Sequence, residues 1–198
     1  MIKRIIFATG NPGKVKEIDE ILKDLGLEVV TMKEAGFDPD IEENGDTLRE
    51  NALIKVRAIG PQPEAVIMSD DSGLFIDALH GQPGIHSARF MGAGAPYPVK
   101  HAAVLKLMQG LKGEERAAHF ACNVAMLFPA GREFVTEGFL YGQIAEEPRG
   151  TGGFGYDPIF LLPERGITNG ELPDGEKNKI SHRFKALSAA KEILKREL

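Results

Sequence analysis

The chain has 198 residues, 42% of them hydrophobic, and a formal net charge of −5, which suits one globular domain of ordinary size. The acidic balance argues against broad nucleic-acid binding, and no apolar stretch of 18 residues is present to cross a membrane. The single cysteine, Cys122, excludes an internal disulfide and fits a reducing cytoplasm. We therefore expect a cytoplasmic protein with a small-molecule ligand, and neither a nucleic-acid nor a membrane partner.

The first predicted elements are a strand, a helix and a second strand. The apolar residues 5–8 predict a short buried strand. Apolar residues at helical spacing over 15–25 predict the helix, and LEVVTM (27–32) predicts the next strand.

A second helix and an interrupted strand follow. Thr47 and Glu50 have the spacing of a capping box, so a helix should begin near Thr47 and end by Gly60. The segment EAVIMSDDSG (64–73) predicts a strand that runs into an acidic turn, and residues 74–79 resume an extended pattern.

The second half begins with a loop over residues 80–97 that is rich in glycine and proline, and Pro98 opens a helix over 98–111. Residues 118–128 and 132–145 predict two long strands, antiparallel across the short turn between them. A terminal helix begins near Ser181. Strands mixed with helices predict the α/β class, and the antiparallel pair predicts a mixed sheet.

The opening loop, FATGNPGK (7–14), has the ingredients of an anion site without either well-known nucleotide motif. A Walker A loop requires glycine where Ala8 stands and Ser or Thr where Val15 stands, and the dinucleotide motif requires a third glycine. A strand-to-helix turn with free backbone N–H groups and Lys14 can still bind an anion. The alternative is a plain turn with a surface lysine.

Two acidic segments could hold a cation. In SDDSG (69–73), two adjacent aspartates follow an apolar strand, where α/β proteins commonly bind ligands. Oxygen ligands favour Mg²⁺, and one aspartate could both bind it and orient a water nucleophile. The cluster IEENGD (41–46) could complete the site. An ordinary acidic turn and a solvated charged surface are the alternatives.

Two further segments suit a nucleotide. The glycines of GTGGFGYDP (150–158) allow close backbone approach to a flat ligand, and Phe154 could stack on a nucleobase. The segment EKNKISHRFKAL (176–187) offers hydrogen-bond donors or positive charge. A glycine-rich hairpin with core aromatics and an ordinary amphipathic helix are the alternatives. His80, His86, His101 and His119 have no metal-ligand spacing, and Cys122 is expected in the core.

In their order and spacing, these motifs resemble the inosine/xanthosine triphosphate pyrophosphatase family. The resemblance extends from Ile5 to about Leu194 and rests on six segments: TGNPGK, ENGDTLRENA, DDSGL, GQPGIHSARF, GTGGFGYDPIF and EKNKISHRFKAL. It implies hydrolysis of non-standard purine nucleoside triphosphates (ITP, dITP, XTP) to monophosphate and pyrophosphate, with Mg²⁺ as cofactor. It also implies a single two-lobed domain over 1–198, with a long central mixed sheet and an active-site cleft between two α/β lobes, that forms a homodimer.

The resemblance also implies site residues. Asp71 would be the general base and a magnesium ligand, with Glu43 as the second ligand, although adjacent Glu42 leaves that alignment open. Lys14 would share in catalysis, and Asp70 would be a supporting acid. The implied substrate-binding residues are Thr9, Gly10, Asn11, Pro12, Gly13, Lys14, Ser72, Phe154, Gly155, Tyr156, Asp157, Lys177, His182 and Arg183.

Within that set, Phe154 would stack on the base, and His182 and Arg183 would donate to its 6-oxo group. A pocket with donors at position 6 disfavours adenine, because adenine leaves those buried donors unpaired, and each unpaired donor costs about 1–3 kcal/mol of binding free energy. Two other classes of protein would use the same phosphate loop and are the alternative functions: a phosphotransferase and a non-catalytic nucleotide sensor.

Overall fold

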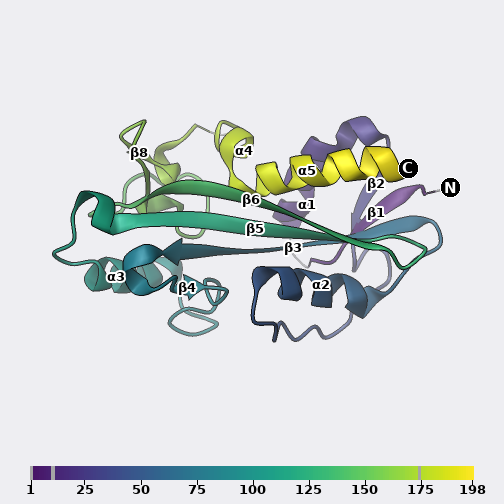
Figure 1. Ribbon diagram of the computed structural model, residues 1–198, viewed down its shortest axis with the longest axis horizontal. Helices are drawn as coiled ribbons and strands as arrows, with labels where there is room; N and C mark the ends of the chain where they lie inside the picture. Colours follow the sequence, from purple (N-terminus) through teal and green to yellow (C-terminus); the bar gives the residue numbers. More distant parts are fainter. Residues whose placement is uncertain (1, 10–11, 174) are drawn as a thin grey trace. The chain divides into compact units, whose positions relative to one another are not determined.

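The computed structural model describes residues 2–9, 12–173 and 175–198 (Figure 1). Over these residues the chain forms an eight-stranded sheet of order β2-β1-β3-β5-β6-β7-β8, with β4 paired to β3. Its strands are β1 (Arg4–Phe7), β2 (Glu28–Thr31), β3 (Ala65–Ile76), β4 (Pro83–Gly84), β5 (Ala117–Leu127), β6 (Glu133–Ile144), β7 (Phe160–Leu162) and β8 (Ile167–Thr168). Its α-helices are α1 (Pro12–Leu22), α2 (Leu48–Ile59), α3 (Tyr97–Leu107), α4 (Lys177–Ile180) and α5 (His182–Glu197).

The sheet is mixed, as predicted. Strand β1 runs parallel to β2 and β3, whereas β3–β4, β6–β7 and β7–β8 are antiparallel. The α/β class is therefore confirmed. The chain divides into two compact units: unit 1 comprises 1–71, 122–138 and 183–198, and unit 2 comprises 72–121 and 139–182.

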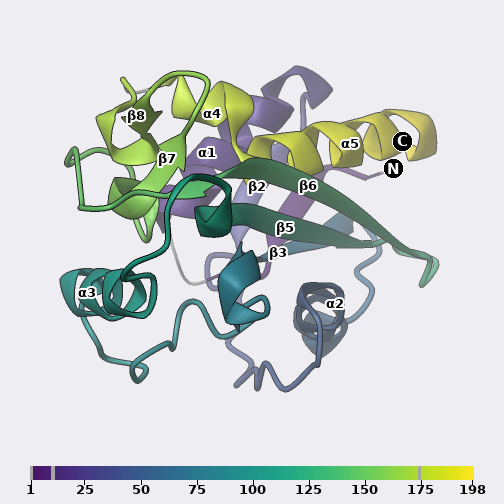
Figure 2. The ribbon, with the colours of Figure 1, turned by 60° about the vertical axis from the view of Figure 1, so that its left-hand side comes forward.

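Unit 1 is a three-layer arrangement with helices on both faces of its strands (Figures 1 and 2). On one face, apolar side chains of β1, β3 and β5 pack against α1 and α5, with Ile18 and Leu187 fully buried. On the other face, Ile6 and Ile67 pack against α2 through Ala52 and Val56. Residues that alternate along β1 therefore enter different cores, which explains why that strand is apolar without interruption.

Helix α2 begins where its capping residues predict. The Thr47 hydroxyl accepts a hydrogen bond from the Glu50 amide (3.1 Å), and the Glu50 carboxylate accepts one from the Asp46 amide (2.8 Å). These two bonds satisfy backbone donors that the first helical turn leaves open. The helix ends at Ile59, and Gly60 follows with φ +75°, a conformation that glycine adopts at little cost.

The prediction of an acidic turn within residues 69–73 is wrong, because β3 continues through these residues as one strand of 12 residues. Charge pairing permits this, since Asp70 and Asp71 each meet a cation. Gly73 permits it too: a Cβ there would lie 2.3 Å from the Gly84 carbonyl oxygen of the neighbouring strand. The acidic pair is thus held by a rigid element rather than by a loop.

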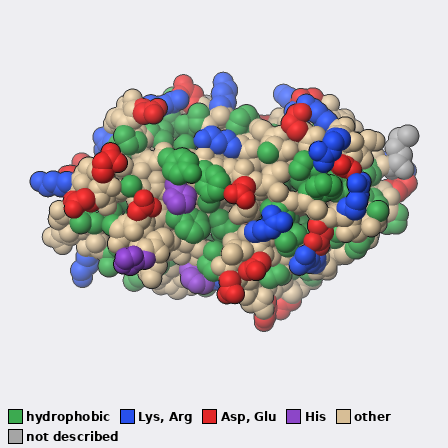
Figure 3. Space-filling view, viewed as in Figure 1, with side chains coloured by type: hydrophobic (Ala, Val, Ile, Leu, Met, Phe, Trp, Pro, Cys, Tyr) green, Lys and Arg blue, Asp and Glu red, His purple; other side chains and the backbone are tan. Residues whose placement is uncertain are grey.

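Unit 2 has its own core, formed by β3, β5 and β6 with α3 and the segment around β7. Helix α3 begins at Tyr97, with Pro98 in its first turn as predicted, but ends at Leu107, before the predicted residue 111. A short helix at Lys177–Ile180 was not predicted. Among the described residues, no helix is long and apolar enough to cross a membrane. Acidic, basic and hydrophobic side chains are interspersed over the face that Figure 3 shows.

Candidate functional site

The first candidate site lies in unit 1, where β1 and β3 end at the same edge of the sheet. The two strands are parallel with Phe7 opposite Met68, and the Ala8 amide donates to the Met68 carbonyl (2.7 Å). This register brings Thr9 beside Asp70. Helix α1 then begins at Pro12, so its N-terminal backbone belongs to the same edge. Ligands of α/β proteins bind at this end of parallel strands.

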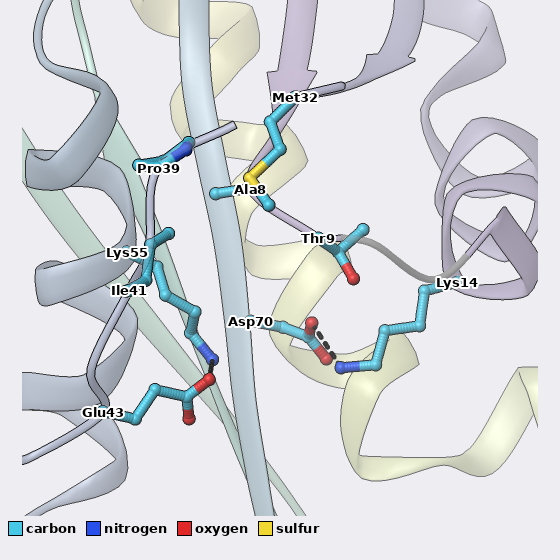
Figure 4. Close-up of a pocket in the computed structure, with 9 residues that line it drawn as sticks. All are labelled: Ala8, Thr9, Lys14, Met32, Pro39, Ile41, Glu43, Lys55 and Asp70. Atoms are coloured by element: carbon cyan, nitrogen blue, oxygen red, sulfur yellow. Dashed lines mark hydrogen bonds and ion pairs between the residues drawn. The ribbon is translucent and has the colours of Figure 1, made fainter. Parts of the chain in front are cut away.

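A pocket of about 270 Å³ opens at this edge (Figure 4). It is lined by Ala8, Thr9, Lys14, Met32, Pro39, Ile41, Glu43, Lys55 and Asp70. In Figure 4, Lys14 reaches Asp70 from one side, and Lys55 meets Glu43 on the other side of the pocket. The charged atoms thus converge from α1, β3, α2 and the segment before α2.

Asp70 joins two cations. Its carboxylate accepts a bond from Lys14 Nζ (2.9 Å) and one from Arg183 Nε (3.0 Å), and the Asp70 and Arg183 side chains are each 2% exposed. Burial alone would raise the pKa of Asp70, but the charges of Lys14 and Arg183 hold it far below its ordinary value. Asp70 is therefore ionised at neutral pH and holds both cations in place.

Asp71 has the opposite electrostatic environment. Burial raises its pKa above the ordinary value; the charge of Lys55 opposes this, and that of Glu43 adds to it. Lys55 Nζ lies 3.4 Å from Asp71 Oδ1 and 3.3 Å from Glu43 Oε1. Burial also disfavours the charge of Lys55, but these acids and Asp70 raise its pKa, so it stays charged. Neighbouring titratable groups with divergent pKa values are typical of catalytic sites.

The raised pKa of Asp71 predicts a specific dependence of stability on pH. The folded state binds this proton more tightly than the unfolded state, whose aspartate pKa is about 3.9, so stability falls as pH rises through the folded pKa. In EDTA, Asp71→Asn should therefore be more stable than the wild type at neutral pH. The difference should shrink as pH falls toward about 4. Urea unfolding of both proteins across this range checks it, and a wild type of equal or greater stability at neutral pH would contradict it.

Two acids of this site are placed where they could hold a cation. Glu43 lines the pocket, whereas Glu42 is exposed to solvent. Asp71 Oδ2 is buried and has no hydrogen-bond partner among the described residues. No group of three or more His, Cys, Asp or Glu side chains suited to a metal occurs in that part of the chain. Two carboxylates fit Mg²⁺, which takes its remaining ligands from water and substrate phosphates.

The second candidate site lies in unit 2, around the turn at residues 154–157. Asp157, only 2% exposed, accepts bonds from the Phe154 amide (2.7 Å) and Lys177 Nζ (2.5 Å). Lys177 Nζ also lies 3.9 Å from the centroid of the Phe154 ring. Gly153 makes this turn possible, because a Cβ there would lie 2.3 Å from the Asp157 carboxylate. The structure thus brings Phe154, Asp157 and Lys177 together, with the Phe154 side chain exposed.

The remaining predicted residues of unit 2 have other surroundings. Tyr156 is a core residue, 3% exposed, and its hydroxyl donates to the Ser87 carbonyl (3.0 Å). The Gly155 carbonyl is bonded to His101 Nε2 (2.8 Å). His182 is buried and stacks on Phe120, with ring centroids 4.8 Å apart. Ser72 is half-buried on β3.

The predicted phosphate loop is described in part. Thr9 and Lys14 line the pocket, and Pro12 and Gly13 are the first residues of α1. The predicted ligands Gly10 and Asn11 lie outside the described residues. Arg183, predicted to read the base, belongs to unit 1 and bonds to Asp70 there.

Sequence reasoning missed two residues of α2. Lys55 is 8% exposed, and Asn51 is fully buried beside apolar residues of the same helix. A signal was present: Lys55 lies three residues after Ala52 and four before Ile59, on the buried face of an amphipathic helix. Because lysine is rarely buried without a partner, its place on that face indicates buried acids nearby.

Comparison with known proteins identifies the family of the chain. The model of the Ham1 family matches residues 5–193, and the chain belongs to that family. A dITP/XTP pyrophosphatase from Caldanaerobacter subterraneus subsp. tengcongensis is 48% identical over 195 residues, 98% of this chain and 97% of the relative. A dITP/XTP pyrophosphatase from Bacillus subtilis is 44% identical over 194 residues, 98% of each chain.

The fold agrees as well. The solved structure of a HAM1 protein from Coxiella burnetii superposes with a TM-score of 0.90 at 38% identity, and it covers 99% of this chain and 100% of that one. The mixed sheet and its flanking helices are therefore the fold of this family.

Proposed function

We propose that this protein hydrolyses non-standard purine nucleoside triphosphates, ITP, dITP and XTP, to the monophosphate and pyrophosphate, and so clears them from the nucleotide pool. The observation that carries the proposal is the acidic pair on β3. One acid is locked between two cations, and the other has a raised pKa at the edge of the sheet where β1 ends. The names of the near-full-length relatives support the same activity and substrate class.

In this proposal, unit 1 binds the triphosphate. Lys14, whose side chain is 26% exposed, supplies positive charge while Asp70 holds it in place. The backbone N–H groups at the start of α1 add donors directed at an anion. Charge that is fixed before the substrate arrives requires no reorganisation during the reaction, which favours the transition state.

Asp71 is the proposed general base. It accepts a proton from water while the water oxygen attacks the α-phosphorus, and the bond from that phosphorus to the bridging oxygen breaks to release pyrophosphate. A base with a raised pKa holds the transferred proton more strongly, which makes it more effective near neutral pH.

Magnesium is the proposed cofactor, and Asp71 and Glu43 are the residues that would hold it. When bound, Mg²⁺ would neutralise charge on the phosphates. The donor set supports this assignment, because both groups are carboxylates, the ligands that Mg²⁺ prefers, and both already lie within 3.4 Å of one cation, Lys55 Nζ. Lys55 lies between the two acids and would limit their mutual repulsion when no cation is bound.

Unit 2 supplies the proposed base site. The exposed ring of Phe154 would stack on the purine, and Asp157 and Lys177 hold the turn that carries it. His182 would donate to the 6-oxo group that inosine and xanthine carry in place of the amino group of adenine. Its stacking on Phe120 fixes the plane of the imidazole, and a fixed donor discriminates better than a mobile one.

His182→Ala should reduce the preference for ITP over ATP by about tenfold, since one hydrogen bond contributes roughly 1–1.5 kcal/mol. The ratio of kcat/KM values for the two nucleotides measures the preference. His86→Ala, which removes an exposed histidine, is the control and should leave the ratio unchanged. An unchanged ratio in His182→Ala would remove this residue from base recognition.

Hydrolysis in ¹⁸O-labelled water tests the proposed reaction. Attack at the α-phosphorus places the label in the nucleoside monophosphate, and mass spectrometry should find it there alone. Label in the pyrophosphate would move the attack to the β-phosphorus, and release of orthophosphate would move it to the γ-phosphorus. Either result would overturn the mechanism.

We further propose a cytoplasmic homodimer. The buried single cysteine, Cys122, suits a reducing compartment. Exposed apolar side chains on and before α3, those of Met91, Tyr97, Val99 and Leu107, support self-association. Sedimentation equilibrium would give twice the chain mass of 21.5 kDa for the dimer.

A further inference from the structure

Two buried polar atoms near the acidic pair have no hydrogen-bond partner among the described residues, and they are complementary. Asn51 Nδ2 is a donor on α2, and Asp71 Oδ2 is an acceptor on β3. Asn51 is fully buried, so water does not reach its amide. Because a buried donor without a partner costs about 1–3 kcal/mol, such a pair in one unit calls for a physical explanation.

The orientation of the Asn51 amide is fixed from its other end. The Gly45 backbone N–H donates to Asn51 Oδ1 at 2.9 Å. Only the oxygen of the amide can accept this bond, so the NH₂ group must point the other way. Gly45 is required for the approach, because a Cβ would lie 2.7 Å from Glu50 Cβ and 2.9 Å from Asn51 Oδ1.

The NH₂ group is directed toward Asp71. Lys55 lies one helical turn after Asn51 on the same buried face of α2 and reaches Asp71, and the Ser69 hydroxyl donates to the Ala52 carbonyl (2.6 Å), so the turn of α2 that carries Asn51 packs against β3 beside Asp71. The other oxygen, Asp71 Oδ1, lies on the Lys55 side at 3.4 Å from Nζ. The two oxygens of Asp71 therefore have different neighbours.

We infer that Asn51 is a positioning residue for Asp71: held by Gly45, its amide is placed to donate to Oδ2, and this bond fixes the rotation of the carboxylate during the reaction. This inference rests on the proposed function, in which Asp71 is the general base. A carboxylate that is free to rotate about its terminal bond would present Oδ1 to the reacting water only part of the time. The amide removes that freedom without contributing a charge.

Asn51→Asp separates this role from a purely structural one. The aspartate has nearly the same shape and can still accept from the Gly45 amide, but it sets a carboxylate against Asp71 in place of a donor. We expect kcat for ITP to fall by about 10–100-fold, the usual effect of removing the partner that orients a reacting group, with KM unchanged. If Asn51 only held residues 44–46, kcat would stay at the wild-type value, which would overturn the inference.

Thr47→Ala is the matched control for damage to α2. It removes the helix cap from the same turn but no group that faces Asp71. Its melting temperature should fall, and its kcat should remain that of the wild type. An equal loss of kcat in Thr47→Ala and Asn51→Asp would assign the effect to the helix and overturn the inference.

A measurement without turnover tests the contact itself. The ¹H–¹⁵N signals of the Asn51 side-chain amide should move when Asp71 is replaced by Asn, because its charged acceptor is lost. The signals of Asn169, whose amide donates to Asp157, should stay in place. Unmoved Asn51 signals would overturn the inference. Since this comparison needs no substrate, it remains decisive even if the wild type releases no pyrophosphate from ITP and the proposed function fails.

Discussion

Asp71→Asn is expected to lower kcat for ITP hydrolysis by about 10²–10⁴-fold, the range that general-base catalysis contributes. Asparagine keeps the shape of the side chain on β3 but cannot take a proton from water. The carboxylate that we propose as a metal ligand is lost as well, so the upper end of the range is expected. Steady-state pyrophosphate release gives kcat, and calorimetry with ITP should still detect binding, because Lys14 and Phe154 remain.

Asp77→Asn is a suitable control, since it removes an exposed carboxylate just beyond the end of β3. It should turn over at the wild-type rate. Retention of more than about a tenth of the wild-type kcat by Asp71→Asn would exclude Asp71 as the general base.

Asp70→Asn should lower the free energy of unfolding by about 3–5 kcal/mol, the usual cost of removing one partner of a buried ion pair. The substitution leaves the guanidinium of Arg183, whose side chain is 2% exposed, without its carboxylate. Lys14 is more accessible and can turn to water, so Arg183 accounts for most of the loss. Guanidinium chloride unfolding at neutral pH measures the change.

The pH dependence of this loss follows from the lowered pKa of Asp70. Its stabilisation is present above the unfolded pKa of about 3.9 and is lost as pH falls through the lower folded value. The difference between Asp70→Asn and wild type should therefore be constant from about pH 5 to 8 and shrink below about 4. Glu64→Gln removes an exposed pair with Lys3 and should leave the unfolding midpoint nearly unchanged. If Asp70→Asn lowers the free energy of unfolding by less than about 1 kcal/mol, the buried ion pairs of Asp70 do not stabilise the fold.

Local sequence signals predicted the elements that depend on local interactions. The capping residues Thr47 and Glu50 placed the start of α2 correctly, because the bonds they make are within one turn. The acidic turn at 69–73 was predicted wrongly, because consecutive aspartates favour turns when nothing pairs with them. Their partners Lys14, Lys55 and Arg183 are distant along the chain, and only the fold brings them to β3.

For the candidate sites too, sequence patterns predicted the locally unusual residues and missed those that only the fold brings into the site. The acidic pair, Lys14 and the turn at 154–157 stand out in the sequence because their residue types are unusual at those positions. Asn51 does not stand out, because an amphipathic helix commonly carries asparagine on its solvent face, and the only sequence signal for Lys55 is its place on the apolar face of the helix. Their burial against β3 and the segment before α2 makes them part of the site. Tyr156 is likewise buried by contacts that are distant in sequence, since its hydroxyl donates to the carbonyl of Ser87, 69 residues earlier.

The most direct test of the central claim is a comparison of pyrophosphate release from ITP, XTP, ATP and GTP by the wild-type protein with Mg²⁺. We predict rapid release from ITP and XTP, and slow release from ATP and GTP. Equal rates for all four nucleotides would contradict a site that reads the base. No release from any of them would contradict the proposed pyrophosphatase activity itself.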